Sequence, residues 1–296
     1  EEGLILTSFY AQPVCGVSHA ALMTGSYPIR VAEPNNIKQL HTVPHPKEIT
    51  IAETLKDAGY ATALIGKWHL AGGPKKPDNS YDPNLMPNAQ GFDYFYGTPR
   101  FNGFTVYVDD TPVRSKIFRN ETVVVEAVQS WDHITQDYTR EALQWIEQKK
   151  DQPFFLYLAH NLPHVPVGAS EAFKGKSKYG PYGDTIEEID WSSGQILAKL
   201  KEQNLDENTL IIFTSDNGPW ISYGNHAGQT PYREAKGTGF DGGTRSACIT
   251  RMPGEIPSGS VSHQAFCSVD LLPTFARLAG ARLPGNPIDG VDVWDI

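Results

Sequence analysis

The fold class is decided by residues 50–69, which read TIAETLKDAGYATALIGKWH. Thr50 and Glu53 have the spacing of a capping box, which predicts the start of a helix that ends near Gly59. The six residues that follow, 60–65, are typical of a short buried strand. A helix that leads directly into a buried strand is the repeating unit of α/β proteins.

The same alternation of helix and strand recurs downstream. Apolar side chains recur every four residues between Ile134 and Lys149, which predicts an amphipathic helix. A second capping box, Thr185 with Glu188, predicts the start of another helix. The remaining expected elements are strands at 154–159 and 209–214 and a helix near 269–279. This order predicts an α/β fold with a doubly wound, mostly parallel sheet sandwiched by helices.

Composition narrows the class of protein. The chain has 296 residues, with 25 Lys and Arg against 34 Asp and Glu, so its formal net charge is −9. Nucleic-acid binding requires clustered cations, and this acidic balance argues against it. No apolar run approaches the roughly 18 residues that a membrane span needs. Three cysteines without a CxxC spacing argue against a disulfide scaffold and a zinc site. We expect a single domain over residues 1–296.

Polar side chains follow three of the predicted strands, at the point where each strand ends. These clusters are Lys67 to His69, His160 to His164, and Asp216 with Asn217. Ligands of parallel sheets bind outside the carboxyl ends of the strands. The sequence therefore predicts a functional site at this edge of the sheet.

Two pairs of oxygen-bearing side chains are candidates for a metal site. Asp216 and Asn217 begin a tight turn after a buried strand and suit a hard cation such as Ca²⁺ or Mg²⁺. The same residue types are common in plain turns, so both interpretations stay open. Asp109 and Asp110 precede Thr111-Pro112, and we interpret them as a hairpin turn.

Further side chains suit chemistry on an anionic substrate. Lys67 and His69 lie two residues apart, so a cation and a proton carrier can point into one crevice. Lys236 lies in a Gly-rich stretch that can cradle an oxyanion, although it does not match a P-loop. Cys15 precedes a predicted helix start, where the helix dipole activates a nucleophile. Each of these side chains can also be interpreted without any catalytic role. A lone Cys, for example, is most often an inert small hydrophobe.

Taken together, these stretches resemble the sulfatase family of the alkaline phosphatase-like superfamily, and within it the arylsulfatase A and N-acetylgalactosamine-6-sulfatase group. The matching segments occur in the family's order over nearly the whole chain. They are residues 9–28 around Cys15, 59–70, 91–97, 153–164, 214–219 and 236–245. The resemblance implies hydrolysis of sulfate monoesters, of aryl compounds or carbohydrates, on the α/β core described above.

The resemblance also implies a nucleophile and a metal site. The family's nucleophile is a cysteine that a formylglycine-generating enzyme oxidises to formylglycine, and the matching residue is Cys15. A divalent metal, usually Ca²⁺ with Mg²⁺ as the alternative, polarises the sulfate. Asp216 and Asn217 match two of its ligands.

Four more residues match catalytic positions of the family. Lys67 and Lys236 match the lysines that hold the sulfate oxygens. His164 matches the histidine near the leaving-group oxygen, a candidate general acid. His69 matches the histidine beside the formylglycine, which helps to expel sulfate and restore the aldehyde.

The chain departs from the family pattern in two ways. The family signature is Cys-x-Pro-x-Arg, whereas residues 15–19 place Val17 at the Pro position and His19 at the Arg position. That Arg is read by the maturation enzyme and braces the nucleophile and the metal-ligand carboxylates, and a neutral imidazole lacks its charge and fork. The family's first strand, whose Asp pair supplies further metal ligands, and its C-terminal subdomain have no counterpart in residues 1–296. We expect the polypeptide alone to be inactive for this reason.

The sequence therefore predicts a sulfuric ester hydrolase core. Two alternatives stay open: a sulfatase-like protein that has lost catalysis and binds sulfated glycans, which His19 motivates, and a phosphate mono- or diesterase on the same scaffold. The resemblance implies a sulfated small molecule or glycan as substrate, the formylglycine-generating enzyme as partner, and an extracytoplasmic location (periplasmic, secreted or lysosomal).

Overall fold

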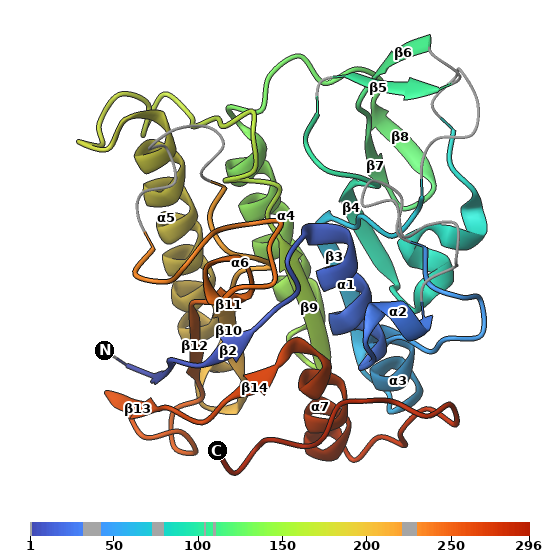
Figure 1. Cartoon of the computed structure of the whole chain (residues 1–296), viewed down its shortest axis with the longest axis vertical. Helices are drawn as coiled ribbons and strands as arrows, with labels where there is room; N and C mark the ends of the chain where they lie inside the picture. The colour runs from blue at the N-terminus through green and yellow to red at the C-terminus, as the bar shows by residue number, and fades with distance from the viewer. Residues whose placement is uncertain (1, 32–42, 73–79, 104, 109–110, 221–229) are drawn as a thin grey trace.

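The helix and strand expected within residues 50–69 are both present in the computed structural model of the chain (Figure 1). It describes residues 2–31, 43–72, 80–103, 105–108, 111–220 and 230–296. Helix α3 is Ile51–Asp57, and strand β3 is Ala61–Lys67. The Oγ1 of Thr50 accepts from the N–H of Glu53 at 3.1 Å, and the Glu53 carboxylate accepts from the N–H of Thr50 at 2.7 Å. The predicted capping box is confirmed.

Strand β3 lies between β4 and β9 in a five-stranded sheet with the order β8-β7-β4-β3-β9. It pairs in parallel with both neighbours, whereas β7 and β8 add antiparallel pairs at one side. The strands are β4 (Tyr94–Thr98), β7 (Ile117–Arg119), β8 (Thr122–Val125) and β9 (Phe154–Ala159).

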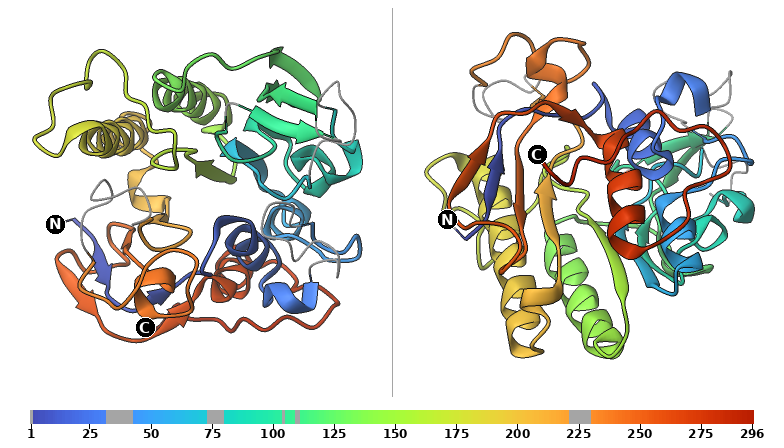
Figure 2. Two further views of the ribbon diagram at one scale, coloured as in Figure 1. Left: turned by 45° about the horizontal axis from the view of Figure 1, so that its top comes forward. Right: turned by 90° about the horizontal axis from the view of Figure 1, so that it is seen from below.

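Helices cover both faces of this sheet, because alternate residues of a strand point to opposite faces. Ala63 and Ile65 of β3 enter one core with α4 and α5, while Leu64 enters a second core with α1, α3 and α7. Figure 2 shows the two groups of helices on opposite sides of the strands. The helices are α1 (Cys15–Thr24), α2 (Pro28–Val31), α4 (Ile134–Lys149), α5 (Gly180–Glu202), α6 (Asp241–Thr244) and α7 (Leu271–Ala279).

A second sheet has the order β10-β12-β1-β13. Strand β12 runs antiparallel to β10 and β1, and β1 runs parallel to β13. Its strands are β1 (Leu4–Leu6), β10 (Ile211–Thr214), β12 (Cys248–Arg251) and β13 (Ser260–Ser262). The α/β class is confirmed, with a parallel ladder around β3 and mixed pairing elsewhere.

The smaller elements complete the description. A short sheet joins β2 (Phe9–Tyr10), β11 (Arg245–Ser246) and β14 (Phe266–Cys267), and β5 (Thr105–Val108) pairs antiparallel with β6 (Thr111–Arg114). Short 3₁₀ turns are η1 (Pro83–Leu85), η2 (Pro87–Gln90), η3 (Asp206–Asn208) and η5 (Ser268–Asp270). Asp109 and Asp110 lie between β5 and β6 but outside the described residues. No helix in the described part of the chain is long and apolar enough to span a membrane.

One expectation about a helix start is wrong. Helix α5 begins at Gly180, so Thr185 lies inside the helix rather than at its N-cap. Its Oγ1 donates to the carbonyl oxygens of Gly168 and Pro181, both at 2.9 Å. Pro181 occupies the first turn, where its missing N–H costs nothing, and this starts the helix earlier.

Candidate active site

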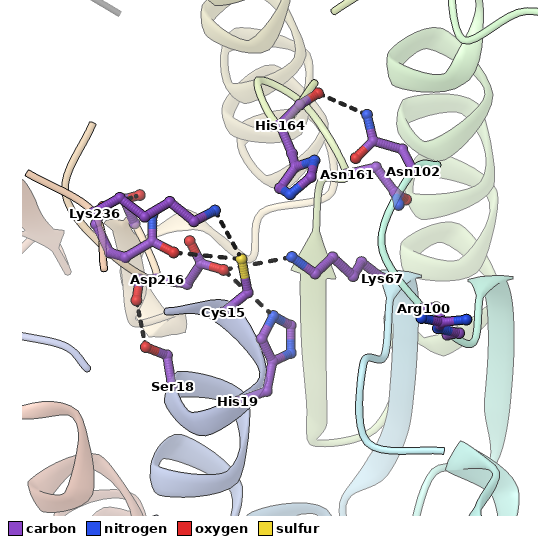
Figure 3. Close-up of polar contacts among 12 residues, drawn as sticks. Cys15, Ser18, His19, Lys67, Arg100, Asn102, Asn161, His164, Asp216 and Lys236 are labelled. Carbon is purple, nitrogen blue, oxygen red and sulfur yellow. Dashed lines mark hydrogen bonds and ion pairs between the residues drawn. The ribbon is translucent and has the colours of Figure 1, made fainter. Parts of the chain in front are cut away.

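Cys15 is the first residue of α1, and its thiol is the point on which the site converges (Figure 3). The Nζ of Lys236 donates to its Sγ at 3.1 Å, and the Sγ donates to the Oδ1 of Asn217 at 3.4 Å. The side chain is buried, with 5% exposed. A helix N-terminus stabilises negative charge, so this position favours an anionic or nucleophilic group.

Asp216 and Asn217 follow β10 directly, as the sequence predicts. The Nζ of Lys67 lies 3.6 Å and the Nε2 of His19 lies 3.8 Å from the Oδ2 of Asp216. Burial raises the pKa of this carboxyl, but Lys67, His19 and Lys236 outweigh burial and bring it to about 2. The carboxylate therefore stays ionised at any ordinary pH.

Lys67 is the last residue of β3, so the parallel ladder sets its position. A Cβ on Gly66 would overlap the carbonyl oxygen of Ala159 in β9. The backbones of β3 and β9 can therefore lie this close together beside Lys67 only because the preceding residue is a glycine, which has no Cβ. Burial lowers the pKa of Lys67, but Cys15 and Asp216 more than offset this and the net pKa is raised.

Lys236 reaches the thiol from a loop that is tied down at two points. Its backbone N–H donates to the carbonyl of Pro219 at 3.0 Å, and the N–H of Gly237 donates to Pro13 at 2.8 Å. Its Nζ also lies 4.8 Å from the ring centroid of Trp220. The structure holds the ammonium of Lys236 in a fixed place beside Cys15. An oxyanion cradle at this stretch, as expected from the sequence, would need such a cation.

His19 is buried on α1 between a carboxylate and a phenol. Burial, followed by the charge of Lys67, lowers its pKa to about 3, so the imidazole is neutral. Its Nδ1 lies 3.3 Å from the hydroxyl of Tyr157. Burial raises the pKa of Tyr157, so this hydroxyl keeps its proton and can donate to Nδ1. The Nε2–H tautomer of His19 then faces Asp216, which is the favourable arrangement with a carboxylate.

His164 is a further histidine that faces the thiol (Figure 3). His164 donates from Nδ1 to the carbonyl of Val165 at 2.7 Å, which leaves Nε2 free to act as acceptor. Its ring lies between Phe101 and Trp220, with centroids 5.5 and 5.4 Å away. Burial, then Lys67 and Lys236, lowers the pKa of His164 to about 3.

His69 is set back from this group. Its ring packs 6.1 Å from that of His19, and neither ring nitrogen has a hydrogen-bond partner within the described residues. Burial, followed by Lys67, lowers its pKa well below the ordinary value. His69 does not line the cavity at Cys15, whereas the other seven predicted residues line this one cavity.

That cavity has a volume of about 1540 Å³. It runs from Cys15 between β9 and β10, with apolar side chains of both strands along its walls. The predicted site residues that line it, besides Cys15, are His19, Lys67, His164, Asp216, Asn217 and Lys236.

The oxygen ligands suit a hard divalent cation in type but are few. The amide of Asn217 donates to Gly218 at 2.9 Å, which turns its Oδ1 towards Cys15 beside the Asp216 carboxylate. The described residues contain no group of three His, Cys, Asp or Glu side chains arranged to hold a metal. Ca²⁺ prefers 6–8 oxygens, so Asp216 and Asn217 fit as part of a larger ligand set.

Two residues that contact the site gave no separate signal in the sequence. Ser18 donates from its hydroxyl to the backbone carbonyl of Asp216, and Tyr157 contacts His19. The alternation within β9 places Tyr157 on the face shared with α1, because Phe155 and Tyr157 pack against the α1 core. That alternation is the one signal that points to Tyr157.

Comparison with known proteins agrees with this geometry. A family model described as Sulfatase matches residues 1–281. The chain belongs to the sulfatase family. N-acetylgalactosamine-6-sulfatase of Canis lupus familiaris is 37% identical over 315 residues, which cover 99% of this chain and 58% of the relative. Arylsulfatase A of Homo sapiens is 35% identical over 317 residues, which cover 98% and 60%. The sulfatase-family chain therefore spans less than two thirds of the length of these relatives.

Solved structures of sulfatases share the fold. The PsFucS1 sulfatase from Pseudoalteromonas sp. has a TM-score of 0.82 and 31% identity, over 99% of this chain and 64% of that chain. Ps i-CgsB in complex with k-i-k-neocarrahexaose has a TM-score of 0.84 and 29% identity, over 99% and 68%. The expected family and the α/β fold are both confirmed.

Proposed function

We propose that this chain is the catalytic core of a sulfuric ester hydrolase in which Cys15 supplies the nucleophile. The observation that carries the proposal is the convergence of the Lys236 ammonium, the Asn217 amide oxygen and the half-buried Asp216 carboxylate on the Cys15 thiol at a helix N-terminus. Such a set of fixed charges suits an anionic group that reacts at the thiol position. Maturation of Cys15 to formylglycine would supply a hydrated aldehyde, whose hydroxyl attacks sulfur.

Lys67 and Lys236 hold the sulfate oxygens in this proposal. Their ammonium groups approach Cys15 from two different elements, β3 and the loop after residue 230 (Figure 3). Two cations on different sides of the anion fix its orientation and stabilise charge that shifts during the reaction.

His164 protonates the leaving-group oxygen through Nε2. Its pKa of about 3 keeps it neutral before substrate binds, because two lysines and burial oppose a third positive charge. A bound sulfate ester carries negative charge, which offsets the lysines and raises the pKa of His164, so that Nε2 takes up a proton from water before the bond to the leaving group breaks. Proton transfer at the leaving group then restores the neutral imidazole.

Asp216 and Asn217 would hold Ca²⁺, or Mg²⁺, beside the nucleophile. A cation there supplies polarisation of the sulfate and lowers the pKa of the attacking hydroxyl. His69, buried behind His19, assists when sulfate leaves and the aldehyde is restored.

The remaining metal ligands come, we propose, from a further strand between β9 and β10. Neither strand has a partner on its facing edge within the described part of the chain, since β9 pairs with β3 and β10 with β12. The cavity between them is walled by residues 154–159 and 209–214 and is also lined by Asp216. An unpaired edge exposes backbone donors and acceptors, and an inserted strand satisfies both edges. A strand inserted here would extend the sheet next to Asp216 and Asn217.

A sulfated carbohydrate or aryl sulfate is the proposed substrate. The relatives named above are an N-acetylgalactosamine-6-sulfatase and an arylsulfatase A, and Ps i-CgsB is described in complex with a neocarrahexaose. A formylglycine-generating enzyme is the proposed maturation partner, and an extracytoplasmic compartment is the proposed location.

The test is sulfate release by the full-length protein, co-expressed with a formylglycine-generating enzyme and supplied with Ca²⁺. An aryl sulfate, a sulfated sugar and the matching phosphate esters are compared, with Cys15→Ala as the control. Sulfate release that the Cys15→Ala variant lacks supports the proposal. Absence of sulfate release from every ester contradicts it, and faster phosphate release favours the phosphoesterase alternative.

His19 favours one second candidate, a lapsed sulfatase that binds sulfated glycans. A neutral imidazole, with 3% of the residue exposed, stands where the family has a permanently charged Arg. Glycan binding without turnover, together with turnover gained by His19→Arg, would select this candidate.

A further inference from the structure

The loop that carries His164 has few backbone donors of its own. Pro163 and Pro166 flank His164 and Val165, and proline has no N–H. The carbonyl groups of this loop therefore need donors from another part of the chain. Asn102, in the segment after β4, supplies them (Figure 3).

The side chain of Asn102 is fully buried, with 0% exposed. Its Nδ2 donates to the carbonyl of His164 at 2.6 Å and to the carbonyl of Pro166 at 3.0 Å. Both amide hydrogens are thus used on the two residues that bracket Val165. Its Oδ1 has no hydrogen-bond partner within the described residues, and the reverse orientation would point that oxygen at two carbonyl oxygens.

Val165 is the residue whose carbonyl fixes the imidazole. The Nδ1 of His164 donates to it at 2.7 Å, and this bond selects the tautomer that leaves Nε2 unprotonated. Asn102 holds the backbone on both sides of this carbonyl. The bond between Asn102 and the loop therefore determines where the Nε2 of His164 points.

A second tie in the same segment fixes the start of the loop. The Nδ2 of Asn161 donates to the Oγ1 of Thr98 at 2.9 Å, and the hydroxyl of Tyr138 donates to the Oδ1 of Asn161 at 2.6 Å. The end of β4 and the loop after β9 are thus joined at two points. The N–H of His164 also donates to the carbonyl of Asn161 at 3.2 Å, and the side chain of Asn102 holds the carbonyl groups on the two sides of Val165.

We propose that Asn102 is the positioning residue for His164, holding its imidazole in place to protonate the leaving-group oxygen. The inference rests on the proposed function, in which His164 is the general acid. It assigns Asn102 no contact with substrate.

The test uses the leaving group as its readout. Full-length matured wild-type protein and Asn102→Ala are compared on aryl sulfates of similar shape, from 4-nitrophenyl to 4-methoxyphenyl sulfate. Nitrophenolate leaves as a stable anion and needs little protonation, whereas methoxyphenolate needs a proton. We expect kcat/KM of Asn102→Ala to fall by a factor of about 3 or less on the first and on the order of 10–100-fold on the second.

A matched control separates positioning from loss of stability. Asn88→Ala removes a half-buried amide of the same size, which donates to the carbonyl of Phe92 at 3.1 Å and to Asn120 at 3.3 Å. We expect its losses to be equal on all esters. If Asn102→Ala does not fold, Asn102→Leu replaces the amide with a side chain of similar shape and no donor.

An equal loss on all esters, or no loss, in the Asn102 variant overturns the proposal. If the wild-type protein releases sulfate from none of them, the proposed function has failed, and the positioning role is judged without turnover. Histidine ¹⁵N spectra then report the tautomer of His164. We expect the Nδ1–H form in the wild type and a mixture in Asn102→Ala, and identical spectra contradict the inference.

Discussion

The Nζ of Lys236 lies 3.1 Å from the Sγ of Cys15, although 221 residues separate them in the sequence. The contact exists because the loop around Lys236 is bonded to the carbonyl groups of Pro13 and Pro219, which lie two residues from Cys15 and Asn217 respectively. A cation held at this distance from a nucleophile position acts on the group that reacts there. The effect of Lys236 on the reaction can therefore be tested separately from the effect of removing a positive charge from the protein surface.

Lys236→Met removes this cation while keeping a side chain of similar length. We predict a fall in kcat/KM for an aryl sulfate of about 10²–10³, the usual effect of losing one fixed charge at a reacting oxyanion. Lys174→Met, on an exposed side chain paired with Asp132, is the control and should leave kcat/KM unchanged. Equal rates for wild type and Lys236→Met would remove Lys236 from the site.

Lys67→Met tests the buried ion pair. Lys67 is 4% exposed and Asp216 is 30% exposed, so the remaining carboxylate would lose its nearest cation in a partly desolvated site. We predict a loss in the free energy of unfolding on the order of 3 kcal/mol. The double variant Lys67→Met/Asp216→Asn should recover part of that loss, because it leaves no unpaired charge. Urea denaturation of Lys67→Met, Asp216→Asn and the double variant measures the coupling, and strictly additive losses would contradict it.

Gly66→Ala tests the close approach that sets Lys67. The φ of Gly66 is 123°, and an added Cβ overlaps the carbonyl of Ala159 across the parallel ladder. We predict a variant that does not fold stably. Gly59→Ala is the control, since its φ of 88° carries the same backbone strain but nothing lies within 4 Å of an added Cβ. It should cost about 1–2 kcal/mol by thermal unfolding. Similar costs for both would contradict steric control at Gly66.

His160 should make the protein acid-sensitive. Burial lowers its pKa to about 4, so the folded state takes up its proton less readily than the unfolded state, whose pKa is about 6.5. The contribution of the neutral His160 to the free energy of unfolding is complete above about pH 6.5. It is lost as the pH falls towards 4, by up to about 1.4 kcal/mol per pH unit. His160→Gln should reduce the fall in unfolding free energy between pH 7 and pH 5. An unchanged fall would show that His160 does not couple folding to protons.

Much of the fold was predictable because local patterns specified it. The Thr50–Glu53 capping box, the four-residue repeat from Ile134 to Lys149 and the apolar strand at 154–159 all appear where the sequence predicts them. The second capping box was wrong because Gly180 and Pro181 start the helix earlier. A capping-box pattern does not show whether residues upstream of it already begin the helix.

The site was predictable where residues follow strand ends or begin a helix. Lys67, Asp216 and Cys15 are such residues, and the topology brings them together. Tyr157 and Asn102 were not predictable, because their roles depend on contacts with residues 138 and 62 positions away. No local pattern encodes those contacts.

The central claim is that Cys15 becomes the nucleophile with His19 in place of Arg. The most direct measurement is the mass of the tryptic peptide that ends at Arg30 and contains both residues, from full-length protein co-expressed with a formylglycine-generating enzyme. We predict the mass of the aldehyde at Cys15. An unmodified thiol in this protein, with the aldehyde appearing only in His19→Arg, would contradict it.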